Sequence, residues 1–243
     1  MQFKRCRFNR KHDCHEEGLR YLMHLYIIAQ YLNLQAPGED RFFKLGRDLL
    51  EQGHRVTIFT GADGVGFELE RKEIGLYNDK GMTMVVLNAP YEQKMSNLQK
   101  LKSYLKFSRM VDRQARLLPK PDLLLVSTPP LSAAIPALKL KKFFDTPLIL
   151  EVRELWPDAP IQRGTLKNRL LIKWARKQEE NVYLKADRIV ASGAGIAESV
   201  KGVITERNKV YTIPDGLDDQ EMQDGYRKAL ENLVSTDVKS RSF

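Results

Sequence analysis

Cysteine is scarce in this chain of 243 residues, and its scarcity excludes one class of protein. The two cysteines, Cys6 and Cys14, both precede the region that shows a folding pattern. A small secreted protein held together by disulfide bonds carries more cysteines than this. We therefore expect a chain that folds through its hydrophobic core in a reducing compartment, the cytoplasm.

Metal-ligand spacings, dinucleotide fingerprints and nucleic-acid recognition motifs are also missing. Cys6 and Cys14 stand further apart than the paired cysteines of zinc sites, although His12 and His15 lie near them. The Gly-x-Gly-x-x-Gly pattern of dinucleotide-binding folds does not occur. We expect no metal, no cofactor and no nucleic-acid partner.

The sequence lacks a run that is long and apolar enough to span a bilayer. Its longest uncharged stretch, Leu123 to Leu138, includes three prolines, whereas a transmembrane helix takes about 20 apolar residues. Basic residues followed by the apolar run Leu22 to Leu32 imitate a signal peptide, but His24 and Gln30 interrupt that run. We interpret the second half of the run as a buried strand.

Acidic residues are outnumbered, because 40 lysines and arginines face 31 aspartates and glutamates. The formal net charge is +9 and the isoelectric point is about 9.4. Such an excess favours anionic partners, such as an acidic membrane surface or phosphorylated substrates. The hydrophobic fraction of 42% is sufficient for a core, which argues against global disorder.

Short apolar stretches alternate with helical patterns along most of the chain. Strands are predicted at 25–32, 55–60, 82–87, 123–127, 148–152, 188–191 and 209–213. Helices are predicted at 42–50 with Gly53 as the C-cap, at 97–118, at 131–144 with a kink at Pro136, at 166–184 and at 195–200, with residues 62–81 loop-rich. The alternation indicates an α/β fold with a doubly wound, mostly parallel sheet.

Three regions differ in character. Residues 1–20 are polar and basic without any period, and we interpret them as a disordered or non-native extension. Residues 21–218 are interpreted as one domain. Residues 219–243 form a short remainder, in which 222–233 is compatible with one helix.

The turn after the first predicted strand is a candidate phosphate site. In a doubly wound fold this turn faces the ligand cleft, and the helix that follows offers free backbone N–H groups. The turn spans Gln35 to Arg41, and Pro37, Gly38 and Glu39 are its candidate binding residues. A plain tight turn remains the alternative, because only one glycine is present.

A second candidate site follows the predicted strand 148–152. Parallel sheets place their sites at the carboxyl ends of strands, and this strand end carries three carboxylates, an arginine and a tryptophan. They are Glu151, Arg153, Glu154, Trp156 and Asp158. Alternation points Glu151 and Arg153 to the same side of the strand. Either these groups orient an acceptor hydroxyl and a leaving phosphate, or they form a salt-bridged strand end around a core tryptophan.

The predicted helix 97–118 carries a basic stripe. Its cations are spaced four, three, four and three residues apart: Lys102, Lys106, Arg109, Arg113 and Arg116. Its apolar side is predicted to comprise Leu101, Tyr104, Leu105, Val111, Ala115 and Leu118. Such a helix binds an anionic membrane surface or is simply the solvated face of a packed helix. The basic segment 163–177 favours the first reading.

One further turn, Ser192 to Gly195, lies between a predicted strand and a short helix. It has the form of a phosphate-binding turn. An N-capping role of its serine is the alternative.

Three long stretches resemble family 4 glycosyltransferases of the GT-B type. The run YIIAQYLNLQAPGEDRFFKLGRDLLEQGHRVTIFTG resembles the opening of that family. The stretch PDLLLVSTPPLSAAIPALKLKKFFDTPLILEVRELWPD resembles the bacterial subgroup that builds capsule, O-antigen and exopolysaccharide. The segments ADRIVASGAGIAESV and KVYTIPDG resemble the approach to the interdomain linker.

This resemblance implies the N-terminal, acceptor-side half of a retaining, metal-independent transferase that uses a nucleotide-sugar. Pro37 and Gly38 match the loop that contacts the donor diphosphate, with Glu39 where the family usually has a second glycine. Arg153, Glu154, Trp156, Pro157 and Asp158 match a VRDLWP-type segment of the family, with Glu154 in place of the more usual aspartate. Arg153, Glu154 and Asp158 are the catalytic residues that the resemblance implies. Glu151 and Trp156 would then lie on the acceptor side. The implied partners are a nucleotide-sugar donor, a lipid-linked saccharide acceptor and the inner face of a membrane.

The family's second domain, which grips the donor, has no counterpart in the 27 residues after Gly216. We therefore expect a truncated or split gene product that is inactive alone. A non-catalytic subunit that docks to a membrane or to a partner chain with the second domain is the alternative.

Overall fold

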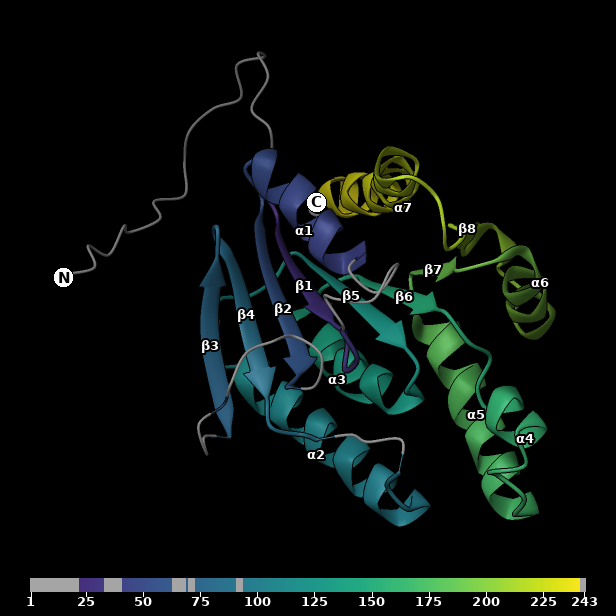
Figure 1. Cartoon of the computed structure of the whole chain (residues 1–243). Coiled ribbons are helices and arrows are strands. Elements are labelled where there is room, and N and C mark those ends of the chain that lie inside the picture. Colours follow the sequence, from purple (N-terminus) through teal and green to yellow (C-terminus); the bar gives the residue numbers. More distant parts are fainter. Residues whose placement is uncertain (1–21, 33–40, 63–68, 70–72, 91–93, 241–243) are drawn as a thin grey trace.

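Eight strands among the described residues form a single sheet in the order β3-β4-β2-β1-β5-β6-β7-β8. The computed structural model describes residues 22–32, 41–62, 69, 73–90 and 94–240 (Figure 1). The strands are β1 (His24–Ile28), β2 (Arg55–Gly61), β3 (Ile74–Asp79), β4 (Met82–Leu87), β5 (Leu123–Thr128), β6 (Leu148–Val152), β7 (Arg188–Ala191) and β8 (Val210–Thr212). Every pairing is parallel except that of β3 with β4, which confirms the predicted doubly wound, mostly parallel sheet.

Helices cover both faces of this sheet. The helices are α1 (Arg41–Glu51), α2 (Asn97–Ala115), α3 (Ala134–Phe144), α4 (Asp158–Gln162), α5 (Arg169–Lys185), α6 (Ala194–Val203) and α7 (Asp219–Ser240), with the short turns η1 (Leu131–Ala133) and η2 (Arg207–Lys209). On one face α2, α3, α5 and α6 pack against the strands, and α1 and α7 pack on the other (Figure 1). Each face thus has a hydrophobic core of its own.

The sequence pattern misses one strand. Residues 62–81 were expected to be loop-rich, but β3 lies within them and pairs antiparallel with β4. The turn between the two strands uses Lys80 and Gly81, both with positive φ, as two-residue hairpins require. The signal is weak because β3 is an edge strand whose side chains are only partly buried.

A glycine and a proline mark the end of α1 and the start of α3. Gly53, with φ of 88°, follows the last turn of α1, as the predicted C-cap requires. The expected kink at Pro136 is wrong, because α3 begins at Ala134 and the proline falls in its first turn. No intrahelical bond is lost there, since N–H groups of a first turn have no partner within the helix.

Helix α7 extends the stretch predicted at 222–233. Its Met222, Tyr226, Ala229 and Leu230 are buried against the face that α1 also covers. The chain after Gly216 therefore returns across the sheet and contributes to its core. The division at residue 218 into a domain and a tail stays a prediction.

Candidate functional site

The carboxyl end of β6 carries a buried charged cluster. The Glu151 side chain is fully buried, and its Oε1 accepts a hydrogen bond of 2.5 Å from the Tyr226 hydroxyl of α7. Arg41, the first residue of α1, approaches the same oxygen with its Nε at 3.3 Å. A carboxylate without solvent is thus held by one cation and one phenol, which offsets part of its cost of desolvation.

Asp215 extends this cluster to the edge of the molecule. It accepts a 2.6 Å hydrogen bond from Arg41, and Arg153 lies 3.8 Å from the same carboxylate oxygen. Glu151 and Arg153 therefore reach one cluster, as strand alternation predicts. We name these five residues, Arg41, Glu151, Arg153, Asp215 and Tyr226, the buried cluster.

The surroundings of the cluster raise the pKa values of two of its residues, Arg41 and Tyr226. Burial opposes the charge of Arg41, but Glu151, Tyr226 and Asp215 outweigh it and raise its pKa above the ordinary value. Burial, followed by the neighbouring Glu151 carboxylate, raises the pKa of Tyr226 well above its usual range. Arg41 is therefore a permanent cation, and Tyr226 is a permanent hydrogen-bond donor to Glu151.

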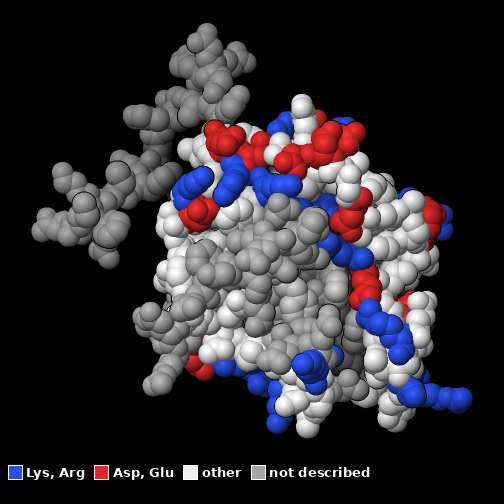
Figure 2. All heavy atoms as spheres, in the orientation of Figure 1, with Lys and Arg blue, Asp and Glu red and all other residues white. Residues whose placement is uncertain are grey.

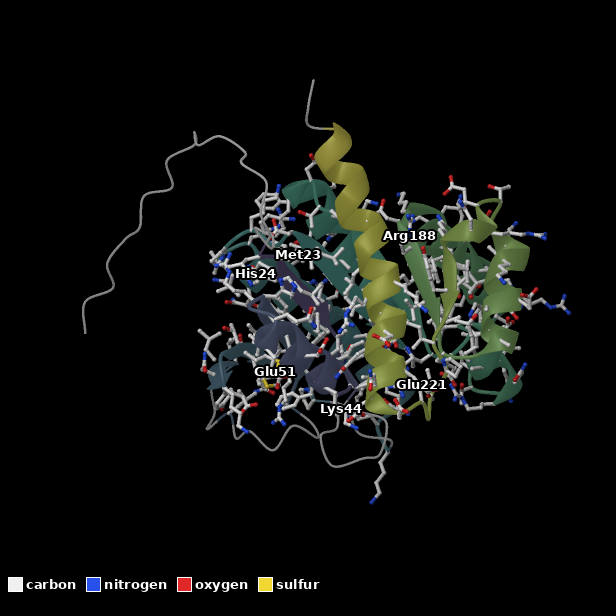
Figure 3. The ribbon with its side chains drawn as sticks, turned by 90° about the horizontal axis from the view of Figure 1, so that it is seen from above. Met23, His24, Lys44, Glu51, Arg188 and Glu221 are labelled. Atoms are coloured by element: carbon white, nitrogen blue, oxygen red, sulfur yellow. The ribbon has the colours of Figure 1, made fainter. Side chains whose placement is uncertain are left out.

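A small cavity opens beside the buried cluster. Its volume is about 130 Å³, and it is lined by Arg41, Lys44, Pro214, Asp215, Gly216, Leu217, Asp219 and Met222. Lys44 forms an ion pair of 2.9 Å with Asp219 at the start of α7. Figure 3 shows Lys44 beside the first turn of α7, where α1 and the incoming chain meet.

The remaining predicted site residues lie apart from this cluster. Glu154 accepts two hydrogen bonds from Arg163, at 2.6 and 3.2 Å, and Asp158 accepts one of 2.6 Å from Arg176. Trp156 is partly buried and packs against the core on the side of α2, α3 and α5. The segment 151–158 therefore contributes to both faces of the sheet at one strand end.

The predictions made for this segment fare differently. Arg153 and Glu151 are brought together, whereas Glu154 and Asp158 are each held by a separate arginine. Their catalytic and acceptor roles stay predictions. Pro37, Gly38 and Glu39 lie outside the described residues, and in the sequence Asp40 separates them from Arg41.

Sequence reasoning gave no role to Arg41, Asp215 or Tyr226. Arg41 is the last residue of the candidate phosphate turn and Asp215 lies in the linker motif, so both belonged to a recognised signal. Tyr226 carried no signal of its own. It enters the cluster only because α7 packs back across the sheet.

The basic stripe of α2 is only partly free of partners. Arg116 is held by Asp112 at 2.8 Å and stacks on Phe143, and Lys106 pairs with Glu73 at 3.5 Å. Lys102, Arg109 and Arg113 are exposed and have no ion pair with any described residue. The predicted apolar side needs correction, because Leu101 and Leu105 are exposed while Phe107, Val111 and Ala115 face the core. The apolar side of α2 is therefore wider than the part of the helix that packs against the core.

No described side chain caps the N-terminus of α6. Ser192 does not cap the helix but donates a 3.3 Å hydrogen bond to the carbonyl of Arg153. The N-capping alternative is therefore wrong for this serine. A Cβ atom added to Gly193 or Gly195 would meet no atom within 4 Å, so space remains beside the first turn of α6.

Within the described part of the chain, no three histidine, cysteine or acidic side chains are grouped as metal ligands. The potential ligands Cys6, His12, Cys14 and His15 lie outside that part. No described helix combines the length and hydrophobicity that crossing a bilayer requires.

A comparison of the sequence with protein families shows to which family the chain belongs. Residues 39–216 match the model of the glycosyl transferase 4-like domain, which is well over half of the chain. The chain belongs to this family. The glycosyl transferase 4-like match begins at Glu39 within the candidate phosphate turn, includes the end of β6, and ends at the linker glycine. No curated protein matches the sequence significantly.

Solved structures share the fold of this glycosyl transferase 4-like chain. A sucrose-phosphate synthase structure from Thermosynechococcus elongatus has a TM-score of 0.57 at 11% identity, covering 87% of this chain and 99% of its own. Starch synthase IV of Arabidopsis thaliana, bound to ADP and acarbose, has a TM-score of 0.55 at 12% identity over 82% of this chain. UGT89C1 of Arabidopsis thaliana, complexed with UDP, has 0.52 at 14% over 81%. This chain spans about half of each of the latter two, 53%.

Proposed function

We propose that this chain is the acceptor-side, N-terminal domain of a glycosyltransferase that uses a nucleotide-sugar donor. Its acceptor is a lipid-linked saccharide at the cytoplasmic face of a membrane, as in bacterial polysaccharide biosynthesis. The observation that carries this proposal is the end of β6, where Glu151, Arg153, Glu154, Trp156 and Asp158 surround one strand end within a glycosyl transferase 4-like domain. Strand ends of this kind are where open α/β sheets bind ligands.

Charge placement supports a division of roles at this strand end. Arg153 and Arg41 supply cations on the side of the linker, where a diphosphate would need neutralisation. Glu154 and Asp158 supply carboxylates on the other side, where hydroxyl groups of a sugar would be accepted. Pro37, Gly38 and Glu39 belong to the diphosphate side in this proposal.

The chain by itself is expected to transfer no sugar. UGT89C1 and starch synthase IV, whose structures hold UDP and ADP, are about twice as long as the matched region. Purified chain, mixed with UDP-, ADP- and GDP-sugars and a polyprenyl-diphosphate saccharide, should release no nucleoside diphosphate. Sugar transfer by the purified chain would contradict the proposed inactivity but not the proposed site.

Binding of the acceptor tests the site directly. Glu154→Gln and Asp158→Asn should each weaken binding of the polyprenyl-diphosphate saccharide in detergent micelles by about fivefold or more. Glu198→Gln is the matched control, because Glu198 is exposed on α6 and its ion-pair partner among the described residues is the neighbouring Lys201. Unchanged affinity in both site variants would move the acceptor elsewhere.

The second candidate function is a non-catalytic subunit that docks to a membrane or to a partner chain with the donor-binding domain. Lys102, Arg109 and Arg113 favour it, because they are exposed without an ion pair to any described residue. Lys102→Glu combined with Arg109→Glu should lower binding to anionic vesicles, and added salt should lower it further. Vesicle binding that survives both changes would remove the support from this stripe.

A further inference from the structure

Helix α5 exposes three large apolar side chains in its first two turns. Leu170 is 79% exposed, and Leu171 and Trp174 are each 54% exposed. The opposite side of the helix holds it to the protein through the buried residues Ala175, Glu179, Val182 and Tyr183. A leucine pair and a tryptophan are therefore left outside without any contribution to the core.

Unpaired cations surround these apolar side chains. Lys167, Arg169, Lys173 and Lys177 are all exposed, and none has an ion pair with a described residue. The nearby acids Glu154 and Asp158 are already engaged with Arg163 and Arg176. The start of α5 thus combines exposed apolar side chains with flanking basic residues.

Helix α2 repeats the combination in its own first turns. Leu98, Leu101 and Leu105 are 62%, 51% and 38% exposed, and their spacing of three and four residues places them on one stripe. Lys102 and Arg109 lie on the adjoining stripe. Two helices that are distant in sequence therefore carry the same pattern at the same end.

Both helix starts lie at one edge of the molecule. Helix α2 follows β4 and α5 follows β6, so both begin at the carboxyl edge of the sheet, and α3 contacts both of them. In Figure 1 their N-terminal ends extend beyond the arrowheads at the lower right. Figure 2 shows lysines and arginines along this lower edge, whereas at the upper edge acidic side chains lie beside further lysines and arginines.

We propose that the first turns of α2 and α5 together form a membrane anchor whose leucines and Trp174 insert into the headgroup region of an anionic bilayer. Charge complementarity selects this occupant, since lysines and arginines flank the apolar tips on both helices. Tryptophan favours the boundary between headgroups and acyl chains, and basic residues contribute about 1 kcal/mol each near anionic lipid. The anchor adds hydrophobic insertion to the electrostatic attraction of the α2 stripe.

The anchor gives the candidate site an orientation. Residues 151–158 lie at the same carboxyl edge and lead directly through α4 into α5. With both helix starts in the headgroups, this strand end faces the lipid surface, from which the saccharide of a lipid-linked acceptor projects. This orientation rests on the proposed acceptor, whereas the anchor itself requires only lipid.

Vesicle flotation with the full chain tests the anchor without donor or acceptor. The chain should bind vesicles that contain phosphatidylglycerol and should bind pure phosphatidylcholine vesicles far more weakly. Leu170→Ser combined with Leu171→Ser should lower the partition coefficient about tenfold or more, because two leucine side chains then lose their burial in lipid. Leu184→Ser is the matched control, since Leu184 is 52% exposed at the opposite end of α5.

A spectroscopic test locates the inserted group. In a Trp156→Phe background Trp174 is the only tryptophan of the chain. Its emission should shift to shorter wavelength on vesicle binding, and lipids brominated near the headgroup should quench it more than lipids brominated at the chain end. Vesicle binding without shift or quenching would overturn insertion.

Other occupants give different outcomes. If the double serine variant abolishes a concentration-dependent dimer in sedimentation velocity while vesicle binding is absent, the apolar tips join two copies of this chain and the lipid proposal fails. If Leu170→Ser with Leu171→Ser and Leu184→Ser lower vesicle binding equally, the position of the leucines is irrelevant and the anchor fails. Neither result affects the acceptor-binding test of residues 154 and 158.

Discussion

The two faces of the sheet treat charge in opposite ways at its carboxyl edge. At the contact of α1 and α7, Arg41, Glu151 and Asp215 turn inward and bind one another. At the starts of α2 and α5, Lys102, Arg109 and their counterparts on α5 turn outward without ion pairs to described residues.

Coverage explains the difference. Helix α7 lies over the strand end on one face, so that a polar group there must find a partner within the protein. No described residue covers the leucines of α2 and α5, and water or a lipid headgroup satisfies the neighbouring cations. Counting charges in the sequence does not distinguish paired, buried charges from exposed ones. Substitutions at the two regions should distinguish them through their effects on stability.

The largest effect is expected from Arg41→Met. This change leaves the buried Glu151 carboxylate with Tyr226 alone, and an unpaired buried charge costs about 3–5 kcal/mol. The free energy of unfolding, measured with urea, should fall by that amount. Arg47→Met on the same helix should cost less than about 1 kcal/mol, because Arg47 is 48% exposed and its carboxylate Asp79 lies 3.6 Å away.

A second substitution separates charge loss from packing loss in this prediction. Arg41→Met combined with Glu151→Gln removes both charges, and it should recover part of the lost stability. If the double variant is as unstable as the sum of the single variants, the buried cluster has no net coupling. The contrast between the two faces of the sheet would then lose its energetic basis.

The pH dependence of stability should reveal a buried acid whose desolvation outweighs the charge of its neighbour Arg176. Burial raises the pKa of Glu179 on α5 from 4.5 to about 7, although the Tyr183 hydroxyl donates a 2.8 Å hydrogen bond to it. A raised folded-state pKa means that Glu179 favours folding fully below pH 4.5 and loses this contribution as the pH rises through about 7. The contribution is about 3 kcal/mol.

Comparison of wild type with Glu179→Gln isolates this effect. Burial lowers the pKa of His24 from 6.5 to about 4, so His24 changes stability in the opposite direction as the pH falls below 6.5. Because His24 is present in both proteins, its contribution cancels in their difference. The stability difference, measured by urea at several pH values, should grow between pH 4.5 and pH 7 and then level off. A constant difference across that range would contradict the raised pKa.

Tyr226→Phe should have an intermediate effect. It removes only the hydroxyl that donates to Glu151, and a hydrogen bond to a charged group contributes about 2 kcal/mol. The midpoint of urea unfolding should shift accordingly without a change in the slope. Tyr211→Phe serves as a control, because that tyrosine is only partly buried on β8. Equal losses in both variants would show that α7 is held by packing alone.

The smallest effect is expected at the exposed pair of Arg163 and Glu154. Arg163 is 59% exposed, and exposed ion pairs contribute about 0–1 kcal/mol. Arg163→Met should therefore leave the unfolding free energy nearly unchanged, in contrast to Arg41→Met. A loss as large as that of Arg41→Met would show that the pair of Arg163 and Glu154 is as tightly coupled as the buried cluster.

Much of the fold could be read from local patterns. The predicted strands coincide with β1, β2 and β4–β8 within a few residues, because apolar β-branched runs bounded by turns are specific to buried strands. Strand β3 was missed because an edge strand needs no apolar face on both sides. On α2, spacing identified an apolar arc, but Leu101 and Leu105 fell outside the part that faces the sheet.

The candidate site was predictable only in part. The strand end with Glu151, Arg153 and Trp156 follows from the rule that parallel sheets bind ligands at carboxyl edges. The partners of these residues do not follow from it, because Arg41, Asp215 and Tyr226 come from segments far apart in the sequence.

The sequence by itself determined the alternation of strands and helices, the parallel sheet and the family of this chain, because periods of two and 3.6 residues and short motifs are local properties. Only the tertiary structure decided which charges are neutralised inside and which leucines are left outside. The physical reason is desolvation, since a side chain loses its water only when a distant segment, here α7, packs over it.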